Sequence, residues 1–181
     1  MKNFLAALFA IAAAMPAFAG EAPKTAPAAY EPMTPFTRYD GKAMRGEWTD
    51  DKGEKLVDIV KWKMILGGRA LESVHRLENS TYGGKTIFFW DEGAKKYVFH
   101  YFTTAGFHTL GEAEFIDGAL VSEEKVEGDS NVASVRSKVT FGTDETIVDV
   151  VYVDKDGTER PGGHRIYKPV ADPGPLFPER E

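Results

Sequence analysis

From residue 43 onward, hydrophobic and polar residues alternate in short runs, and most runs end at a cluster of Gly, Asp, Asn or Ser. A period of two places neighbouring side chains on opposite faces of an extended chain, so each run predicts a β-strand. The clearest run predicts one inward row, made of Val135, Ser137, Val139 and Phe141. We predict about ten strands, at residues 43–49, 55–66, 69–78, 87–90, 97–104, 107–116, 119–127, 132–141, 145–153 and 158–168.

The links between these runs hold only a few residues, which permits antiparallel neighbours and leaves no room for a parallel crossover. An up-and-down strand order follows. A long meander with two unpaired edges invites aggregation, and closure into a barrel removes both edges. We therefore predict an all-β, antiparallel, up-and-down barrel of about ten strands, a size that encloses a small cavity. A sandwich of two meander sheets is the alternative.

The most aromatic stretch is 83–111, which the strands around it must cover. In its second strand the two faces are both apolar: Tyr97, Phe99 and Tyr101 share one, and Val98, His100 and Phe102 share the other. Two further strands offer polar groups to the interior. His75 shares a face with Leu71, and Asp149 shares a face with Ile147 and Val151, so we predict both side chains to point inward.

Residues 1–19 have the features of a secretory signal peptide: Lys2, an apolar stretch and a small-residue cleavage site ending at Ala19. The apolar stretch is shorter than the roughly 20 residues that span a bilayer, which favours removal over anchoring. Residues 20–42 form a leader rich in Pro and Ala, and residues 169–181 form a proline-broken tail. Within the leader, residues 36–40 are either a plug for one end of the core or part of a linker.

Composition narrows the function further. The net charge is −6 and basic residues are scattered, which predicts neither a nucleic-acid partner nor an anionic-membrane partner. Together with the short apolar stretch, this predicts no stable membrane anchor. The chain has no cysteine, so it has neither a disulfide nor a thiol for lipid attachment. We predict a periplasmic or secreted bacterial protein that is stabilised by its core alone.

Several motifs together resemble an uncharacterised family of lipocalin-like bacterial secreted barrels. They are Trp62, the Leu-Gly-Gly-Arg-Ala-Leu of 66–71, the Tyr-Gly-Gly of 82–84, Trp90-Asp91 and the Lys-Lys-Tyr-Val of 95–98. Gly46-x-Trp48 is also similar to the Gly-x-Trp that opens lipocalin barrels. The resemblance implies a calycin-type barrel over residues 43–168, and it implies no activity because the family has none assigned. The chain differs from the family at Trp90, where Tyr is usual, and at 101–104, where Trp-x-Asp-Ser is common.

The four histidines, His75, His100, His108 and His164, show no spacing that preassembles a metal site, and we predict neither a metal nor a cofactor. His100 and His108 lie on adjacent predicted strands. A haem-binding barrel with one axial histidine is one alternative. A small barrel enzyme of hydrolase or isomerase type, using Asp149 with His75 or His100, is another. The sequence contains no recognised catalytic motif, and we name no catalytic residue.

These observations predict a barrel that binds a small apolar or amphipathic molecule. Aromatic side chains form the wall of the predicted lumen, and a few polar groups orient the ligand. The oligomeric state is not determined by the sequence. The predicted lumen residues are Trp62, Arg69, His75, Trp90, His100, Tyr101, Asp149 and Tyr152.

Overall fold

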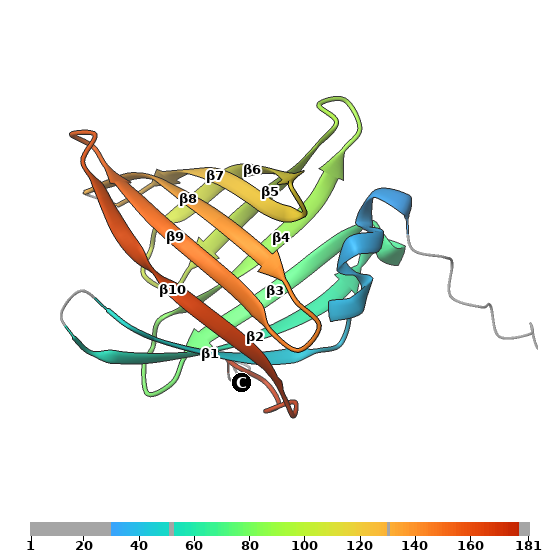
Figure 1. Cartoon of the computed structure of the whole chain (residues 1–181), viewed down its shortest axis with the longest axis horizontal. Coiled ribbons are helices and arrows are strands. Elements are labelled where there is room, and N and C mark those ends of the chain that lie inside the picture. Colours follow the sequence, from blue (N-terminus) through green and yellow to red (C-terminus); the bar gives the residue numbers. More distant parts are fainter. Residues whose placement is uncertain (1–29, 51–52, 130, 178–181) are drawn as a thin grey trace, which may run out of the picture.

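The computed structural model describes residues 30–50, 53–129 and 131–177, and it confirms the predicted barrel. Ten antiparallel strands form one closed sheet (Figure 1). The strands are β1 (Ala43–Thr49), β2 (Lys55–Ile65), β3 (Ala70–Leu77), β4 (Gly83–Asp91), β5 (Lys96–Thr103), β6 (His108–Ile116), β7 (Ala119–Glu127), β8 (Val132–Phe141), β9 (Thr146–Asp154) and β10 (Glu159–Val170).

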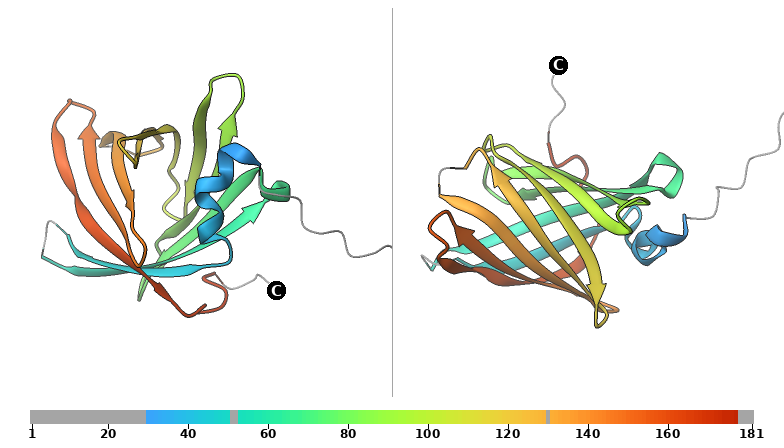
Figure 2. Two further views of the ribbon diagram at one scale, coloured as in Figure 1. Left: turned by 45° about the vertical axis from the view of Figure 1, so that its right-hand side comes forward. Right: turned by 90° about the horizontal axis from the view of Figure 1, so that it is seen from above.

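Each strand pairs with its neighbours in sequence, and β1 closes the barrel by pairing with both β2 and β10. Gly46 of β1 lies at this closure, opposite Asp58 of β2 on one side and Tyr167 of β10 on the other. Closure leaves no exposed sheet edge, so the barrel form is found and not the sandwich. Figure 2 shows the ring of strands from two further directions.

One end of the barrel is closed by η1 (Glu31–Tyr39), a 3-10 helix that precedes β1 (Figures 1 and 2). A 3-10 helix has three residues per turn, so residues spaced by three share one side. Met33, Phe36 and Tyr39 have this spacing, and all three are buried. We call this end the plugged end and the opposite end the far end. The links after β2, β4, β6 and β8 lie at the plugged end, and the links after the other strands lie at the far end. Residues 36–40 were predicted to be either a plug or part of a linker, and the structure shows that they belong to the plug.

The plug is held by contacts to several strands. The Phe36 ring packs edge-on against Phe88 and Tyr97, with ring centroids 5.0 and 5.3 Å apart. The Tyr97 hydroxyl donates to the carbonyl oxygen of Pro32 at 2.7 Å, and the Tyr39 hydroxyl lies 2.9 Å from the hydroxyl of Thr146. Aromatic packing and buried hydrogen bonds therefore fix η1 across the barrel end.

The tail after β10 lies on the outside of β2 and β3. Lys61 donates to the carbonyl of Gly174 at 3.0 Å and pairs with Asp172, while Arg76 donates to the carbonyl of Leu176 at 2.9 Å. Another short 3-10 turn, η2 (Leu66–Gly68), joins β2 to β3. The predicted signal peptide and the start of the leader lie outside the described residues. Within the described part of the chain, no helix has the length and apolar character needed to cross a membrane.

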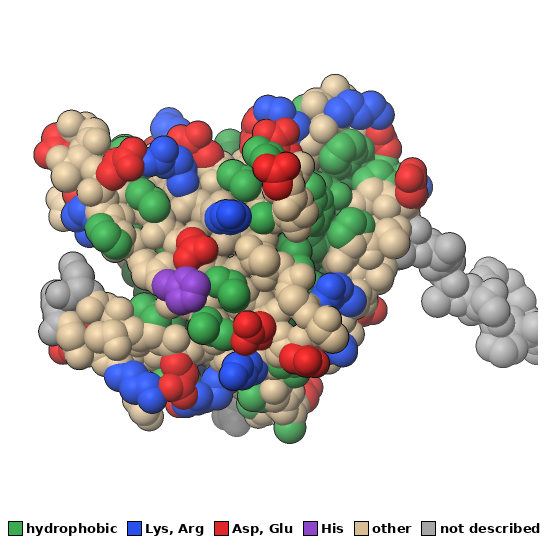
Figure 3. All heavy atoms as spheres, in the orientation of Figure 1, with side chains coloured by type: hydrophobic (Ala, Val, Ile, Leu, Met, Phe, Trp, Pro, Cys, Tyr) green, Lys and Arg blue, Asp and Glu red, His purple; other side chains and the backbone are tan. Residues whose placement is uncertain are grey.

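The outer surface carries acidic and basic side chains interspersed with hydrophobic ones (Figure 3). Several ion pairs join neighbouring strands there, including Lys85 with Glu72 and Lys96 with Glu112, each at 2.8 Å. Exposed pairs of this kind contribute little to stability because water screens them. The aromatic inner face therefore supplies most of the stabilisation.

Candidate functional site in the barrel lumen

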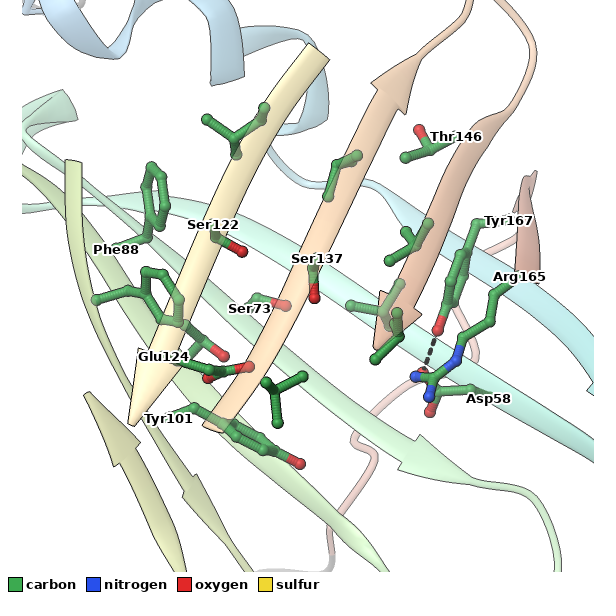
Figure 4. A pocket seen from close by; sticks show the side chains of 18 of the residues that line it. Asp58, Ser73, Phe88, Tyr101, Ser122, Glu124, Ser137, Thr146, Arg165 and Tyr167 are labelled. Carbon is green, nitrogen blue, oxygen red and sulfur yellow. Dashed lines mark hydrogen bonds between the residues drawn. The ribbon is translucent and has the colours of Figure 1, made fainter. Parts of the chain in front are cut away.

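The inward side chains enclose a cavity of about 350 Å³, which is within the range of small-molecule sites. Every strand and the plug contribute a lining residue. Figure 4 shows part of the lining from close by. The apolar and aromatic lining residues are Phe36, Met44, Val60, Trp62, Leu71, Phe88, Phe99, Phe107, Leu120, Val135, Val139, Phe141, Val148 and Val150. The polar and tyrosine lining residues are Asp58, Ser73, Tyr82, Thr86, Tyr101, Thr109, Ser122, Glu124, Ser137, Thr146, Tyr152, Arg165 and Tyr167.

The lining changes in character along the barrel axis. Two strands show this plainly when each is followed from the plugged end: β7 has Leu120, Ser122 and Glu124, and β3 has Leu71, Ser73 and His75. The plugged end is apolar, the middle carries hydroxyl groups, and the charged groups lie toward the far end. The cavity is therefore amphipathic, with its polar groups at one end.

A buried carboxylate organises the far end. Asp58 is 4% exposed and projects from β2 into the lumen. One of its oxygens, Oδ1, lies 2.9 Å from Nδ1 of His75, and the other, Oδ2, accepts a hydrogen bond from the Tyr167 hydroxyl at 2.9 Å. A buried carboxylate needs such partners, because burial without them is costly. Both oxygens of Asp58 are thus engaged within the protein.

The hydrogen-bond chain continues from His75 to two tyrosines. Nε2 of His75 lies 2.7 Å from the Tyr101 hydroxyl, which in turn lies 3.1 Å from the Tyr82 hydroxyl. Both ring nitrogens of His75 are therefore occupied. Burial raises the pKa of Tyr82 and of Tyr101, so both phenols stay protonated at neutral pH.

Two glycines make room for this chain. A β-carbon at Gly46 would lie 2.7 Å from the Tyr167 ring, and one at Gly84 would lie 2.4 Å from the Tyr101 ring. Both distances are closer than van der Waals contact allows. The missing side chains let each tyrosine ring cross over a neighbouring strand and reach Asp58 or His75.

Arg165 is a charged lining residue on β10. Its guanidinium stacks over the Trp48 ring, 4.4 Å from the centroid. Its Nη2 donates to the carbonyl oxygen of Gly162 at 3.0 Å and lies 3.4 Å from the Tyr152 hydroxyl, whereas Nε is buried without a partner. Figure 4 shows Arg165, Tyr167 and Asp58 at the same side of the cavity.

Glu124 is the second lining carboxylate. It accepts a hydrogen bond from the hydroxyl of Thr109, a residue that is 2% exposed. Burial raises the pKa of Glu124, and the Thr109 hydroxyl acts in the opposite direction. Burial is the larger effect, so Glu124 is protonated more readily than a carboxyl group in water.

Trp62 supplies one further polar atom near the plugged end. Its Nε1 is buried and has no partner in the described part of the chain. The indole ring packs against Tyr39 of the plug, with centroids 5.6 Å apart. This N–H group is a buried donor without an acceptor among the described residues.

Three predicted lumen residues line the cavity: Trp62, Tyr101 and Tyr152. His75 points inward as predicted, and it lies behind Tyr101 and Asp58 in the hydrogen-bond chain. The predicted inward row of β8 is also confirmed, since Val135, Ser137, Val139 and Phe141 all line the cavity.

The inward orientation predicted for Asp149 is wrong. Asp149 is exposed and pairs with His164 on the outside of the barrel, with 2.6 Å between Oδ1 and Nδ1. Both faces of β9 are rich in valine, so alternation alone does not choose between them. The register chooses: Val139 of β8 pairs with Val148, and paired residues share a face.

The same effect places His100 outside. It alternates with Phe99 and Tyr101, which pair with the inward residues Phe88 and Thr86 of β4. His100 is exposed, and the ring of Phe102 lies between it and His108, about 6 Å from each. The two histidines are therefore not direct partners. Across the described residues, no group of three or more His, Asp or Glu side chains is arranged to hold a metal ion.

Arg69 and Trp90 also lie away from the cavity wall. Arg69 is exposed beside η2, and its guanidinium covers the Tyr30 ring, 4.6 Å from the centroid. Trp90 shares a strand face with Phe88 and packs edge-on against Tyr97 at 5.0 Å, as part of the core near the plug. Both residues support the plugged end.

Sequence reasoning missed Asp58, Glu124 and Arg165. Asp58 had a detectable signal, because it alternates with Val60 and Trp62 and so belongs to the apolar row of its strand. Glu124 had the same signal, because it alternates with Leu120, Ser122 and Val126, whereas the opposite row of β7 holds the other charged residues. Arg165 had none, since both rows of β10 contain basic side chains.

The fold and the site together define a closed antiparallel barrel with an amphipathic internal cavity. The sequence matches no protein-family model, and it has no significant match among curated proteins. The resemblance to lipocalin-like barrels therefore depends on the motifs and on the barrel itself. Gly46 gives one of those motifs a physical role, because its missing side chain accommodates Tyr167.

Proposed function

We propose that this protein is a lipocalin-like, calycin-type barrel that binds a small apolar or amphipathic molecule in its lumen. The cavity of about 350 Å³ carries this proposal, because well-packed protein interiors leave few voids larger than a water molecule. An aromatic wall with a few polar groups at one end is the usual composition of a small-molecule site. The features of residues 1–19 support a periplasmic or secreted location.

The experiment measures binding of N-phenylnaphthylamine, a neutral apolar dye that fluoresces in nonpolar surroundings. We expect saturable binding to the mature chain at one site. Ser137→Trp places an indole in the cavity and should abolish this binding. Thr140→Trp, on the exposed face of the same strand, is the matched control and should bind the dye as the wild type does.

Two outcomes would contradict the proposal. One is the absence of saturable dye binding to the folded wild-type protein. The other is equal binding by the Ser137→Trp and Thr140→Trp proteins, which would place the dye on the outer surface. Native mass spectrometry of the protein purified from its own source would then give the mass of any natural ligand.

The enzyme alternative has a different residue set from the one predicted. Asp58, and not Asp149, is the carboxylate beside His75. The arrangement does not favour catalysis, because burial raises the pKa of Tyr101 and keeps its hydroxyl, the group beside Nε2 of His75, protonated and hard to activate. The hydrogen-bond chain is better explained as a brace that fixes the far end of the cavity.

The haem alternative needs an inward histidine with a free ring nitrogen. His75 points inward, but its two nitrogens bind Asp58 and Tyr101. His100, His108 and His164 are exposed on the outer face. Axial ligation would therefore require the hydrogen-bond chain to break, and the geometry favours the apolar or amphipathic ligand.

A further inference from the structure

The polar end of the cavity contains a cation without a counterion. Arg165 lines the cavity, and none of the ion pairs among the described residues includes it. Its neighbouring oxygens, those of Gly162, Tyr152 and Tyr167, are all neutral, and its Nε has no acceptor at hydrogen-bond distance. Arg165 is half-buried, so its guanidinium is only partly hydrated and an anion at this position would be favoured.

The nearby acidic groups do not fill this role. Both oxygens of Asp58 are engaged, one with His75 and the other with Tyr167. Glu124 projects from β7 and receives its hydrogen bond from Thr109. Among the described residues, neither carboxylate forms an ion pair with Arg165, so its guanidinium is open to pairing with an anion that enters the lumen.

The surroundings of Arg165 determine the kind of anion. A guanidinium presents planar donors that match a carboxylate or a phosphate. A single guanidinium matches one negative charge. Asp58 at the same side of the cavity repels any anion there, and it repels a doubly charged phosphate about twice as strongly as a singly charged carboxylate. These charges favour a carboxylate over a phosphate.

The rest of the cavity determines the remainder of the molecule. Beyond the hydroxyl groups of its middle, the wall toward the plug is formed by Leu71, Phe88, Leu120 and Phe141. A chain that extends from Arg165 toward Phe36 would leave charged surroundings and enter apolar ones. The hydrophobic effect favours a hydrocarbon there, at about 25 cal/mol for each Å² buried.

Resting on the binding function proposed above, we infer that the ligand is an amphipathic monocarboxylate. Its carboxylate accepts hydrogen bonds from the Arg165 guanidinium beside Tyr152 at the far end. Its hydrocarbon part occupies the apolar end below the plug. Arg165 is therefore the residue that selects an acid over the corresponding alcohol or ester.

The test is displacement of N-phenylnaphthylamine by four molecules with the same hydrocarbon chain: dodecanoic acid, dodecanol, methyl dodecanoate and dodecyl phosphate, each below its micelle-forming concentration. We expect the acid to bind roughly tenfold to a hundredfold more tightly than the alcohol or the ester, as a charged hydrogen bond allows. Arg165→Gln should remove that preference, so that the acid binds no more tightly than the alcohol. Arg136→Gln, which removes an exposed arginine that pairs with Glu159 outside the barrel, is the charge-matched control and should keep the preference.

The outcomes separate the two proposals. Dye binding with equal displacement by acid and alcohol would overturn the carboxylate inference and retain the binding barrel. Tighter binding of dodecyl phosphate than of dodecanoic acid would also overturn it. Lack of any dye binding would overturn the binding function itself. If Arg165→Gln does not fold, the four molecules compared on the wild type and on Arg165→Lys still test the carboxylate inference. Lys keeps the positive charge but lacks the planar donors, so Arg165→Lys should show a reduced preference for the acid.

Discussion

The Tyr167 hydroxyl donates a 2.9 Å hydrogen bond to Oδ2 of Asp58 across an intervening strand. The two residues lie on β10 and β2, and β1 runs between them. Gly46 of β1 pairs with both, and its lack of a side chain lets the Tyr167 ring cover the strand. The three residues therefore join the first two strands to the last, where the barrel closes.

Gly46→Ala should weaken this closure. Its new β-carbon would lie 2.7 Å from the Tyr167 ring, which must move and lose its bond to Asp58. We expect a loss of about 1–3 kcal/mol in the free energy of unfolding, measured by urea denaturation. Gly93→Ala is the control, since its β-carbon would meet only the side chain of Asp91, at 3.3 Å. Equal stability of the two variants would show that Gly46 is not needed for packing.

Tyr167→Phe removes the hydroxyl and leaves one Asp58 oxygen without its donor. We expect destabilisation of about 1–3 kcal/mol, because a buried acceptor loses its partner. Tyr30→Phe provides a close control: the Tyr30 hydroxyl is buried without a partner, so its removal should be neutral or stabilising. Chemical denaturation of both variants compares them directly. A Tyr30→Phe protein as unstable as Tyr167→Phe would contradict the assignment.

Glu124→Gln should make stability less dependent on pH. Burial raises the folded-state pKa of Glu124 above its unfolded value, so its stabilising contribution is complete below the unfolded pKa of about 4.3 and is lost as pH rises through the folded pKa. The variant should therefore be as stable as the wild type at pH values below about 4.3, and more stable than the wild type at pH values above the folded-state pKa of Glu124. Thermal unfolding measured across pH values is the test. Glu123→Gln, on the exposed face of β7, should follow the wild type at every pH.

Phe36→Ala should disrupt the plug. Phe36 is 2% exposed and contacts aromatic rings on β4, β5, β6 and β8, so we expect a loss of about 3–5 kcal/mol. The cavity would also open at this end, and bound dye should dissociate faster in stopped-flow measurements. Phe102→Ala removes a ring that is 51% exposed on the outer face and should change stability by no more than about 0.5 kcal/mol. Unchanged dye dissociation in Phe36→Ala would show that the plug does not limit access.

The sequence by itself determined the strands and their order. Period-two alternation and short links specify antiparallel neighbours, and an apolar row beside a charged row, as in β8, also specifies which face points inward. Where both rows are apolar, as on β9, the local pattern leaves the face open, which is why the orientation of Asp149 was predicted wrongly.

Tertiary structure decided which charged groups belong to the site. The register across β8 and β9 placed Asp149 outside. Pairing of β2 with β3 brings Asp58 to His75, 17 residues away, and closure of the barrel brings it to Tyr167, 109 residues away. The surroundings of Arg165 also depend on which strands pair with β10. A short-range sequence pattern contains no information about contacts between segments that are far apart in the chain.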